Sequence, residues 1–235
     1  MRDGEIDEIL KKAARAPHDM DRALLDRIAV SIGSSLRPVR PLPPPWVLAG
    51  GLVLICAAVA LAGAALLGLH GIQKLSVPER ALIFPALVIQ LGLAATACVS
   101  ERIPGSRRFA APGLLLGAAS LTLLAVFAVL FRDYRTDRFV PQGIACLIAG
   151  LLQAIPASLG IRLLLRRGFA VNRVSAGLVA GTLAGLAGAT MLELHCANFQ
   201  ALHVMLWHTA VVPISAGAGA LLASAAPLLG RIGRS

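Results

Sequence analysis

The spacing of apolar positions changes near residue 45, from a periodic pattern to long uninterrupted runs. Residues 3–16 carry apolar side chains at i, i+3, i+4 and i+7, with acidic residues early and basic residues late. This pattern predicts an amphipathic helix whose charges complement its dipole. Pro17 ends that helix, and we expect a second one before Gly33, because apolar residues again share one side. The two apolar faces hold Ile6, Ile9, Leu10, Leu24, Leu25 and Ile28.

Six apolar runs follow, and each is long enough to cross about 30 Å of hydrocarbon at about 1.5 Å per residue. We therefore predict an all-α membrane protein, a six-transmembrane-helix bundle with a short helical cytoplasmic N-terminal segment. The expected parts are N-terminal helices at 1–35, a proline-rich linker at 36–46, a transmembrane domain at 47–228 and a cytoplasmic tail at 229–235. The runs are 47–67, 82–99, 112–131, 140–165, 174–194 and 202–222.

Composition and charge fix the class of protein and its orientation. The chain is 57% hydrophobic and 14% charged, which lies outside the usual range of soluble domains. The net charge of +10 does not indicate nucleic-acid binding, because the basic residues form short clusters between the apolar runs. The tail, the even-numbered loops and the C-terminus hold 17 Lys and Arg residues, against 5 in the alternate loops. The positive-inside rule therefore predicts that both termini are cytoplasmic.

The N-terminal segment is too small to bury a core of its own. It is joined to the first span by LRPVRPLPPPW, whose five prolines favour an extended, semi-rigid spacer. Up to Pro45 it has eight basic and seven acidic residues, a balance that argues against a polybasic lipid anchor. Its helices either lie on the membrane surface or dock against a cytoplasmic partner, and we favour a protein partner.

Several residues inside the spans predict how the helices pack. Gly177, Gly181 and Gly185 recur at four-residue spacing, which brings one helix face close to a neighbouring backbone. We expect tight packing within the chain rather than a dimer contact. Gln90 and Gln153 have no charged companion, so we expect hydrogen bonds across helices. Pro156 and Pro213 interrupt the fourth and sixth spans and are expected to kink them.

Of the four cysteines, Cys146 and Cys196 both fall toward the outer face in this topology. They alone share an oxidising side. The chain has no CxxC pair, so thiol chemistry would have to join residues distant in sequence. Whether the two sulfurs meet depends on their depths, and lone cysteines in apolar helices are often small packing residues.

A second candidate is a transient metal site at the outer face. His195, Cys196 and His203 lie close together in the sequence and offer nitrogen and sulfur ligands, with Cys146 as a fourth. Their spacing is not diagnostic, and we favour a structural role in which His195 and His208 hydrogen-bond carbonyls at helix ends or kinks. Glu193 is expected to be a solvated interfacial carboxylate, with metal ligation as the alternative.

Four segments resemble the NrsF-like family of bacterial membrane anti-sigma factors, the negative regulators of sigma F. They are LRPVRPLPPPW, GIACLIAGLLQAIP around Cys146, and MLELHC with LHVMLWHTAVVP around Cys196. The resemblance implies an inner-membrane protein whose cytoplasmic tail sequesters an extracytoplasmic-function sigma factor. It also implies that Cys146 and Cys196 take part in sensing metal or oxidative stress. The tail has no His/Cys zinc motif, so the resemblance does not extend to soluble zinc-binding anti-sigma domains.

These inferences lead to the hypothesis of a non-enzymatic signal transducer. The apolar tail faces hold the sigma factor at the membrane, and stress outside alters the Cys146/Cys196 site. The alternative is a membrane thiol oxidoreductase or small transporter that uses the same cysteines, although no CxxC motif supports it. A purely structural membrane subunit is a third alternative.

Overall fold

The computed structural model describes residues 8, 11, 22–35, 42–103, 105–106 and 110–232. The chain forms two compact units, Met1–Pro41 and Leu42–Ser235. In the first unit, helix α2 (Arg22–Ser35) occupies the position of the second predicted amphipathic helix. The predicted helix at 3–16 lies outside the described residues apart from Glu8 and Lys11.

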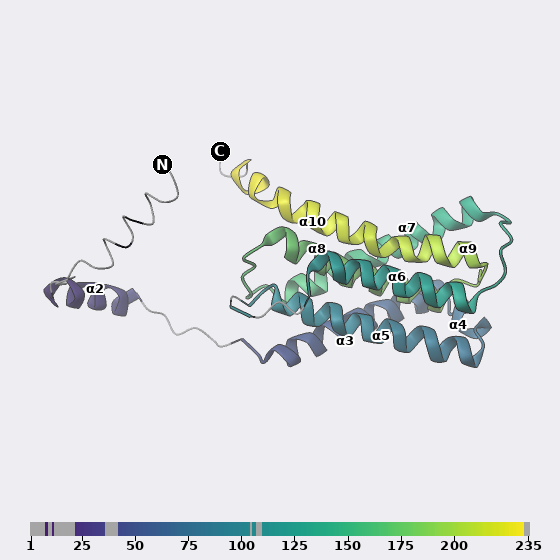
Figure 1. Ribbon diagram of the computed structural model, residues 1–235, viewed down its shortest axis with the longest axis horizontal. Coiled ribbons are helices and arrows are strands. Elements are labelled where there is room, and N and C mark those ends of the chain that lie inside the picture. The colour runs from purple at the N-terminus through teal and green to yellow at the C-terminus, as the bar shows by residue number, and fades with distance from the viewer. Residues whose placement is uncertain are drawn as a thin grey trace. The chain divides into compact units, whose positions relative to one another are not determined.

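The second unit is a helical bundle, and no strand occurs in the part of it that the structure describes. Six segments are long and apolar enough to cross a membrane, which confirms the predicted fold class. Figure 1 shows them running alongside one another, with the short α4 (His70–Lys74) at the end opposite the start of α3. The six are α3 (Pro45–Leu67), α5 (Val77–Ser100), α6 (Pro112–Leu130), α7 (Phe139–Leu164), α8 (Arg173–His195) and a last segment of α9 (Ala201–His203), η1 (Val204–His208) and α10 (Thr209–Ile232).

Among the starts of the six spans, that of the second differs most from the prediction. Helix α5 begins at Val77, five residues before the expected start at 82. Ser76 and Glu79 form a capping box, in which the Ser76 backbone N–H donates to Glu79 Oε2 at 2.6 Å. The cap satisfies backbone donors that the first turn leaves unpaired, so the helix extends beyond its apolar run.

Helix α8 is the centre of the bundle and contacts each of the other five spanning segments. Gly177 and Gly181 lie directly against the α10 backbone, where any added Cβ would collide with the carbonyl oxygens of Gly219 and Ser215. Gly185 makes a similar approach to Val212. The glycine stripe therefore packs two helices of the same chain backbone to backbone.

The two buried glutamines behave differently. Gln153 of α7 donates from Nε2 to the carbonyl of Val59 in α3 at 2.5 Å, as expected. Gln90 of α5 is buried but has no hydrogen-bond partner among the described residues, so the expectation of a cross-helix bond was wrong there. Pro156 and Pro213 lie within the continuous helices α7 and α10.

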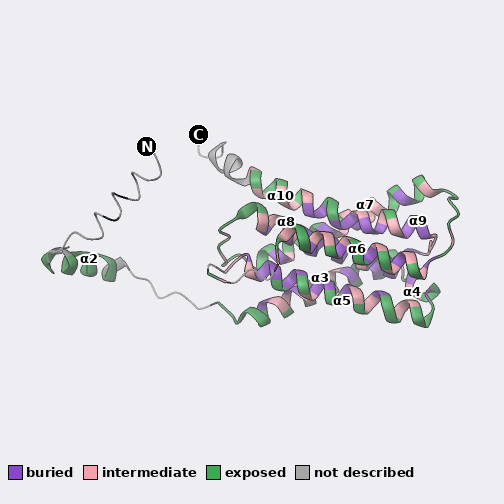
Figure 2. Ribbon diagram, in the orientation of Figure 1, coloured by how far each residue is buried: buried purple, intermediate pink, exposed green. Residues whose placement is uncertain are grey.

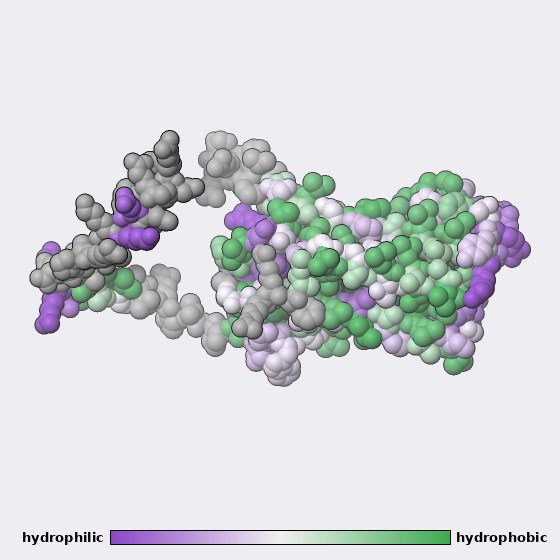
Figure 3. Space-filling model, in the orientation of Figure 1, coloured by the Kyte–Doolittle hydropathy of each residue, from purple (hydrophilic) through white to green (hydrophobic). Residues whose placement is uncertain are grey.

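The surface of the second unit is divided by polarity. Buried residues line the sides of the helices that face one another, and exposed residues face outward (Figure 2). Figure 3 shows apolar side chains along the sides of the bundle and hydrophilic ones at its ends, with the larger group at the right-hand end of the view. That end contains α4, the 131–138 loop and the 196–200 loop, and we call it the loop end. Helix α3 begins and α10 finishes at the opposite end (Figure 1).

Candidate functional site

The structure brings the two cysteines of the loop end together. Cys146 lies in the first turns of α7, and Cys196 directly follows α8. Their Sγ atoms are 3.5 Å apart, although 50 residues separate them in the sequence. Both thiols are free; Cys196 is buried and Cys146 is half-buried. Chain topology therefore creates a thiol pair that no local motif encodes.

Local hydrogen bonds hold Cys196 over α7. The Cys196 backbone N–H closes the last turn of α8 on the Leu192 carbonyl at 2.7 Å. In the following loop, Asn198 donates from Nδ2 to Gln142 Oε1 of α7 at 2.7 Å. The same Asn198 accepts the Gln200 backbone N–H at 3.0 Å, which fixes the loop before α9 begins. The position of Cys196 is thus set by α8 on one side and by α7 on the other.

Two histidines complete the surroundings of Cys196. His203 and His208 are both fully buried, with ring centroids 5.3 Å apart in an edge-on arrangement. His203 Nε2 lies 3.6 Å from Cys196 Sγ. In an α-helix, residues five apart point about 140° away from each other. The π-helical turn η1 (Val204–His208) instead brings both rings to the same side of the segment.

Glu193 is not the solvated interfacial carboxylate that we expected. It is fully buried, and its Oε1 lies 2.6 Å from Nδ1 of His208, which is also fully buried. The expectation that His208 bonds a carbonyl was wrong for the same reason. A carboxylate can be buried here because the imidazole N–H compensates for its lost hydration.

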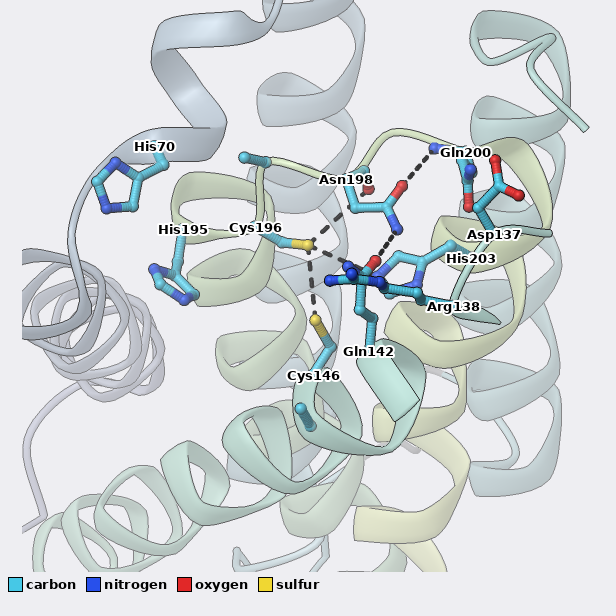
Figure 4. Close-up of a pocket in the computed structure, with 12 residues that line it drawn as sticks. His70, Asp137, Arg138, Gln142, Cys146, His195, Cys196, Asn198, Gln200 and His203 are labelled. Atoms are coloured by element: carbon cyan, nitrogen blue, oxygen red, sulfur yellow. Dashed lines mark hydrogen bonds between the residues drawn. The ribbon is translucent and has the colours of Figure 1, made fainter. Parts of the chain in front are cut away.

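His195 has a structural role instead of belonging to the cluster. Its Nδ1 bonds the carbonyl of Gly68 at 2.8 Å, at the end of α3, so it does meet a helix-end carbonyl as expected. Figure 4 shows its ring on the side facing His70, away from the Cys146 sulfur. Of the predicted ligand set, the structure therefore brings Cys196, His203 and Cys146 together and leaves His195 outside the group. The groups whose ligand atoms lie within 4.8 Å of one another are Cys146, Cys196, His203 and His208.

An open cleft of about 690 Å³ leads to this group from the loop end. Cys146, Cys196 and His203 line it, as do Asp137 and Arg138 of the preceding loop. The pKa of the Cys196 thiol is raised above its ordinary value, first by the hydrogen bond with Cys146 and then by burial, while the nearby His203 and His208 rings oppose the shift. Cys196 therefore stays protonated at neutral pH.

The 131–138 loop is anchored beside the cleft. The Asp133 carbonyl accepts the backbone N–H of Ala201 at 2.7 Å, which joins the loop to the start of α9. The Asp133 side chain pairs with Arg135 at 2.9 Å, and this hydrogen-bonded guanidinium holds the pKa of Asp133 below its ordinary value. The pair is exposed, so it shapes the loop rather than the buried cluster.

The other predicted site residues lie elsewhere. Leu25 and Ile28 are 40% and 45% exposed on α2. The remaining members of the predicted docking face are outside the described side chains: Ile6, Ile9, Leu10 and Leu24.

The burial of Glu193 could have been predicted from the sequence, because it shares one face of α8 with Leu186 and Ala189 at i−7 and i−4.

Comparison with known proteins gives one family. A family model described as NrsF, negative regulator of sigma F, matches residues 33–226. No curated protein and no solved structure matches the chain. The matched range contains every residue of the buried Cys/His group.

Proposed function

Because the chain belongs to the NrsF family, the negative regulators of sigma F, we propose that it is a membrane-embedded anti-sigma factor with a stress sensor at the loop end. It holds an extracytoplasmic-function sigma factor through its N-terminal segment. It releases that factor when the Cys146/Cys196 site responds to a metal or an oxidant. The observation that carries the sensor is the 3.5 Å approach of the two sulfurs beside an open cleft.

The distribution of charge supports an orientation with both termini in the cytoplasm of a bacterial inner membrane. Helix α3 begins and α10 finishes at the same end of the bundle (Figure 1). The loops at that end contain Arg102, Arg166 and Arg167, whereas the N-terminal tail adds eight further basic residues. Positive loops are retained on the cytoplasmic side, so the loop end faces outward.

The docking surface for the sigma factor is the apolar face of the N-terminal helices. On α2, Leu25 and Ile28 are exposed at helical spacing. Ile32 lies on the same side and is 53% exposed. An apolar stripe on so short a segment gains stability only when a partner covers it. Burial of a few such side chains at about 1.5–3 kcal/mol each is enough to hold a partner.

Two chemical changes at Cys146 and Cys196 could operate the sensor, disulfide formation and metal binding. Oxidation would join the two sulfurs at about 2.05 Å, a closure of about 1.5 Å, with two protons and two electrons passing to an external oxidant such as a peroxide. Metal binding would instead bridge them. Oxidation would pull the end of α8 toward α7, whereas a bound ion would fix the two helix ends relative to each other. Helix α8 contacts every other span.

Release requires two packings of the bundle that bind the partner differently. A signal with equal energy in both states shifts no population. A 100-fold difference in partner affinity corresponds to about 2.7 kcal/mol. Helices α7 and α10 flank the site and carry Pro156 and Pro213, so they are the candidate moving parts.

Capture of the partner tests this function. Full-length protein purified in detergent should retain a sigma factor from a bacterial extract, and Leu25→Asp with Ile28→Asp should abolish that retention. Val30→Asp is the matched control, because Val30 is exposed on the opposite side of α2. The proposal fails if the unmodified protein retains no sigma factor, or if the double variant and the Val30→Asp control reduce retention equally.

A further inference from the structure

We propose that Cys146, Cys196, His203 and His208 form one four-ligand site for a divalent, thiophilic metal ion such as Zn²⁺ or Cd²⁺, with Glu193 orienting His208. The four ligand atoms lie within 4.8 Å of one another, and three of the four residues are buried. Two thiolates and two imidazoles are a ligand set that such ions prefer in tetrahedral geometry.

Two of the six separations between ligand atoms match those of a tetrahedron around a single ion. With metal–sulfur distances of about 2.3 Å and metal–nitrogen distances of about 2.0–2.1 Å, two sulfurs lie about 3.8 Å apart and a sulfur and a nitrogen about 3.6 Å apart. The Cys146 and Cys196 sulfurs are 3.5 Å apart, and Cys196 Sγ is 3.6 Å from His203 Nε2. An ion could therefore enter with small adjustments of the side chains.

A buried ring nitrogen without a hydrogen-bond partner is independent evidence for a metal site. A carboxylate can only accept, so His208 Nδ1 donates its proton to Glu193 Oε1. When the ring is neutral, as a metal-bound imidazole is, Nε2 then carries the lone pair. Nε2 is fully buried and has no hydrogen-bond partner among the described residues. Metal-bound histidines commonly have this arrangement, with the second ring nitrogen held by a carboxylate.

The charge of the complex favours a divalent ion. Two thiolates and two neutral imidazoles around a divalent ion sum to zero, which suits a site with low exposure to water. Binding releases two thiol protons to solvent. A monovalent ion would leave a net negative charge beside the buried Glu193 carboxylate. The cleft lined by Cys146, Cys196 and His203 is the route by which the ion reaches the group (Figure 4).

This inference deepens the proposed function and rests on it only for the consequence of binding. The ion would tie together α7, the end of α8 and the π-turn η1. Metal binding would thus select one packing of those three segments.

Titration of the reduced, metal-free, full-length protein with Co²⁺ alone tests the site. We expect one ion per chain, visible bands of tetrahedral cobalt and a thiolate charge-transfer band, all displaced by Zn²⁺. Cys146→Ser and Cys196→Ser should each lower the intensity of the charge-transfer band, because one thiolate remains, and His203→Ala should change the bands of tetrahedral cobalt. Glu193→Gln should keep the bands but weaken affinity about 10–100-fold, as loss of a supporting carboxylate does.

His195→Ala and His70→Ala are matched controls, since both histidines line the same cleft outside the four-ligand group. They should leave the titration unchanged. The site is wrong if the protein binds no cobalt, if the charge-transfer band keeps its full intensity in both cysteine variants, or if His195→Ala removes the bands. Thermal unfolding of each metal-free variant identifies any that fail to fold, and Glu193→Gln then provides the decisive comparison.

Partner release measured in the same samples separates this inference from the proposed function. Metal binding without release of the sigma factor would support the site and contradict its regulatory role. Absence of metal binding, with induction by oxidant still lost in the cysteine variants, would contradict the site and leave the anti-sigma function in place.

Discussion

Nδ1 of His208 lies 2.6 Å from Oε1 of Glu193, and neither side chain is exposed. The two residues belong to different spanning segments, so the contact joins α8 to the last segment of the bundle. Removal of one partner of such a buried pair destabilises the protein, whereas replacement of both partners by apolar side chains is often tolerated.

Glu193→Leu should therefore destabilise the protein by about 1–3 kcal/mol, because His208 would keep a buried, unpaired N–H. The double variant Glu193→Leu with His208→Phe should recover most of that loss. Unfolding in detergent measures both values. Equal stability of the single variant and the unmodified protein would show that the pair is not a structural contact.

The glycine stripe of α8 gives a second prediction. Gly181→Ala should cost about 1–3 kcal/mol, because the added Cβ meets the α10 backbone and overpacks the contact. Gly217→Ala in α10 is the control, since nothing lies within 4 Å of its added Cβ. It should be neutral or stabilising by up to about 1 kcal/mol. Unfolding in detergent measures both changes in stability. If Gly217→Ala destabilised the protein more than Gly181→Ala, this packing would be contradicted.

Gly63 and Gln153 should be energetically coupled. The Gln153 side chain occupies the space that a Cβ on Gly63 would need, and this allows its bond to Val59. Gly63→Ala should displace the glutamine and remove a bond of about 0.6 kcal/mol, with added strain. In a Gln153→Ala background the same change should be nearly neutral. A double-mutant cycle without coupling would contradict this arrangement.

Thiol labelling tests the orientation. A membrane-impermeant maleimide added to intact cells should modify Cys146, which is half-buried in the cleft, and leave the buried Cys56 and Cys98 unmodified. Labelling should disappear in Cys146→Ser. Modification that requires permeabilised cells would place the loop end inside instead.

Cys196 should react more slowly than Cys146. Its raised pKa keeps the thiol protonated at neutral pH, and only the thiolate reacts. Its rate, measured in the unmodified protein by mass spectrometry of each labelled cysteine, should rise at a higher pH than the rate of an ordinary thiol does. A rate that is maximal already at neutral pH would argue against the environment described for this thiol.

Signalling requires both cysteines if the loop end is the sensor. Cys146→Ser and Cys196→Ser should each keep the sigma factor bound while preventing its release by metal or oxidant, because the proposed docking face and the cysteines lie in separate units. A reporter of sigma-factor activity measures release. Normal induction in both variants would remove these thiols from the mechanism.

Run length and hydropathy were sufficient to predict the six spans, because a helix in lipid must satisfy its own backbone. The start of α5 was missed because the Ser76–Glu79 capping box extends the helix into polar sequence. The buried Glu193 was missed because charge alone suggested exposure. His208 could not be placed from a period of 3.6 residues, since the π-turn changes the angle between it and His203.

The π-turn also sets the register of everything that follows it. A π-turn holds one residue more than an α-turn, so its conversion to α-helix would rotate the rest of α10 by about 100° and shift it by about 1.5 Å. That rotation would turn Gly219 away from Gly177, where the two backbones now touch. The extra residue at Val204–His208 thus lets one helix align its histidines at one end and its glycine contact at the other.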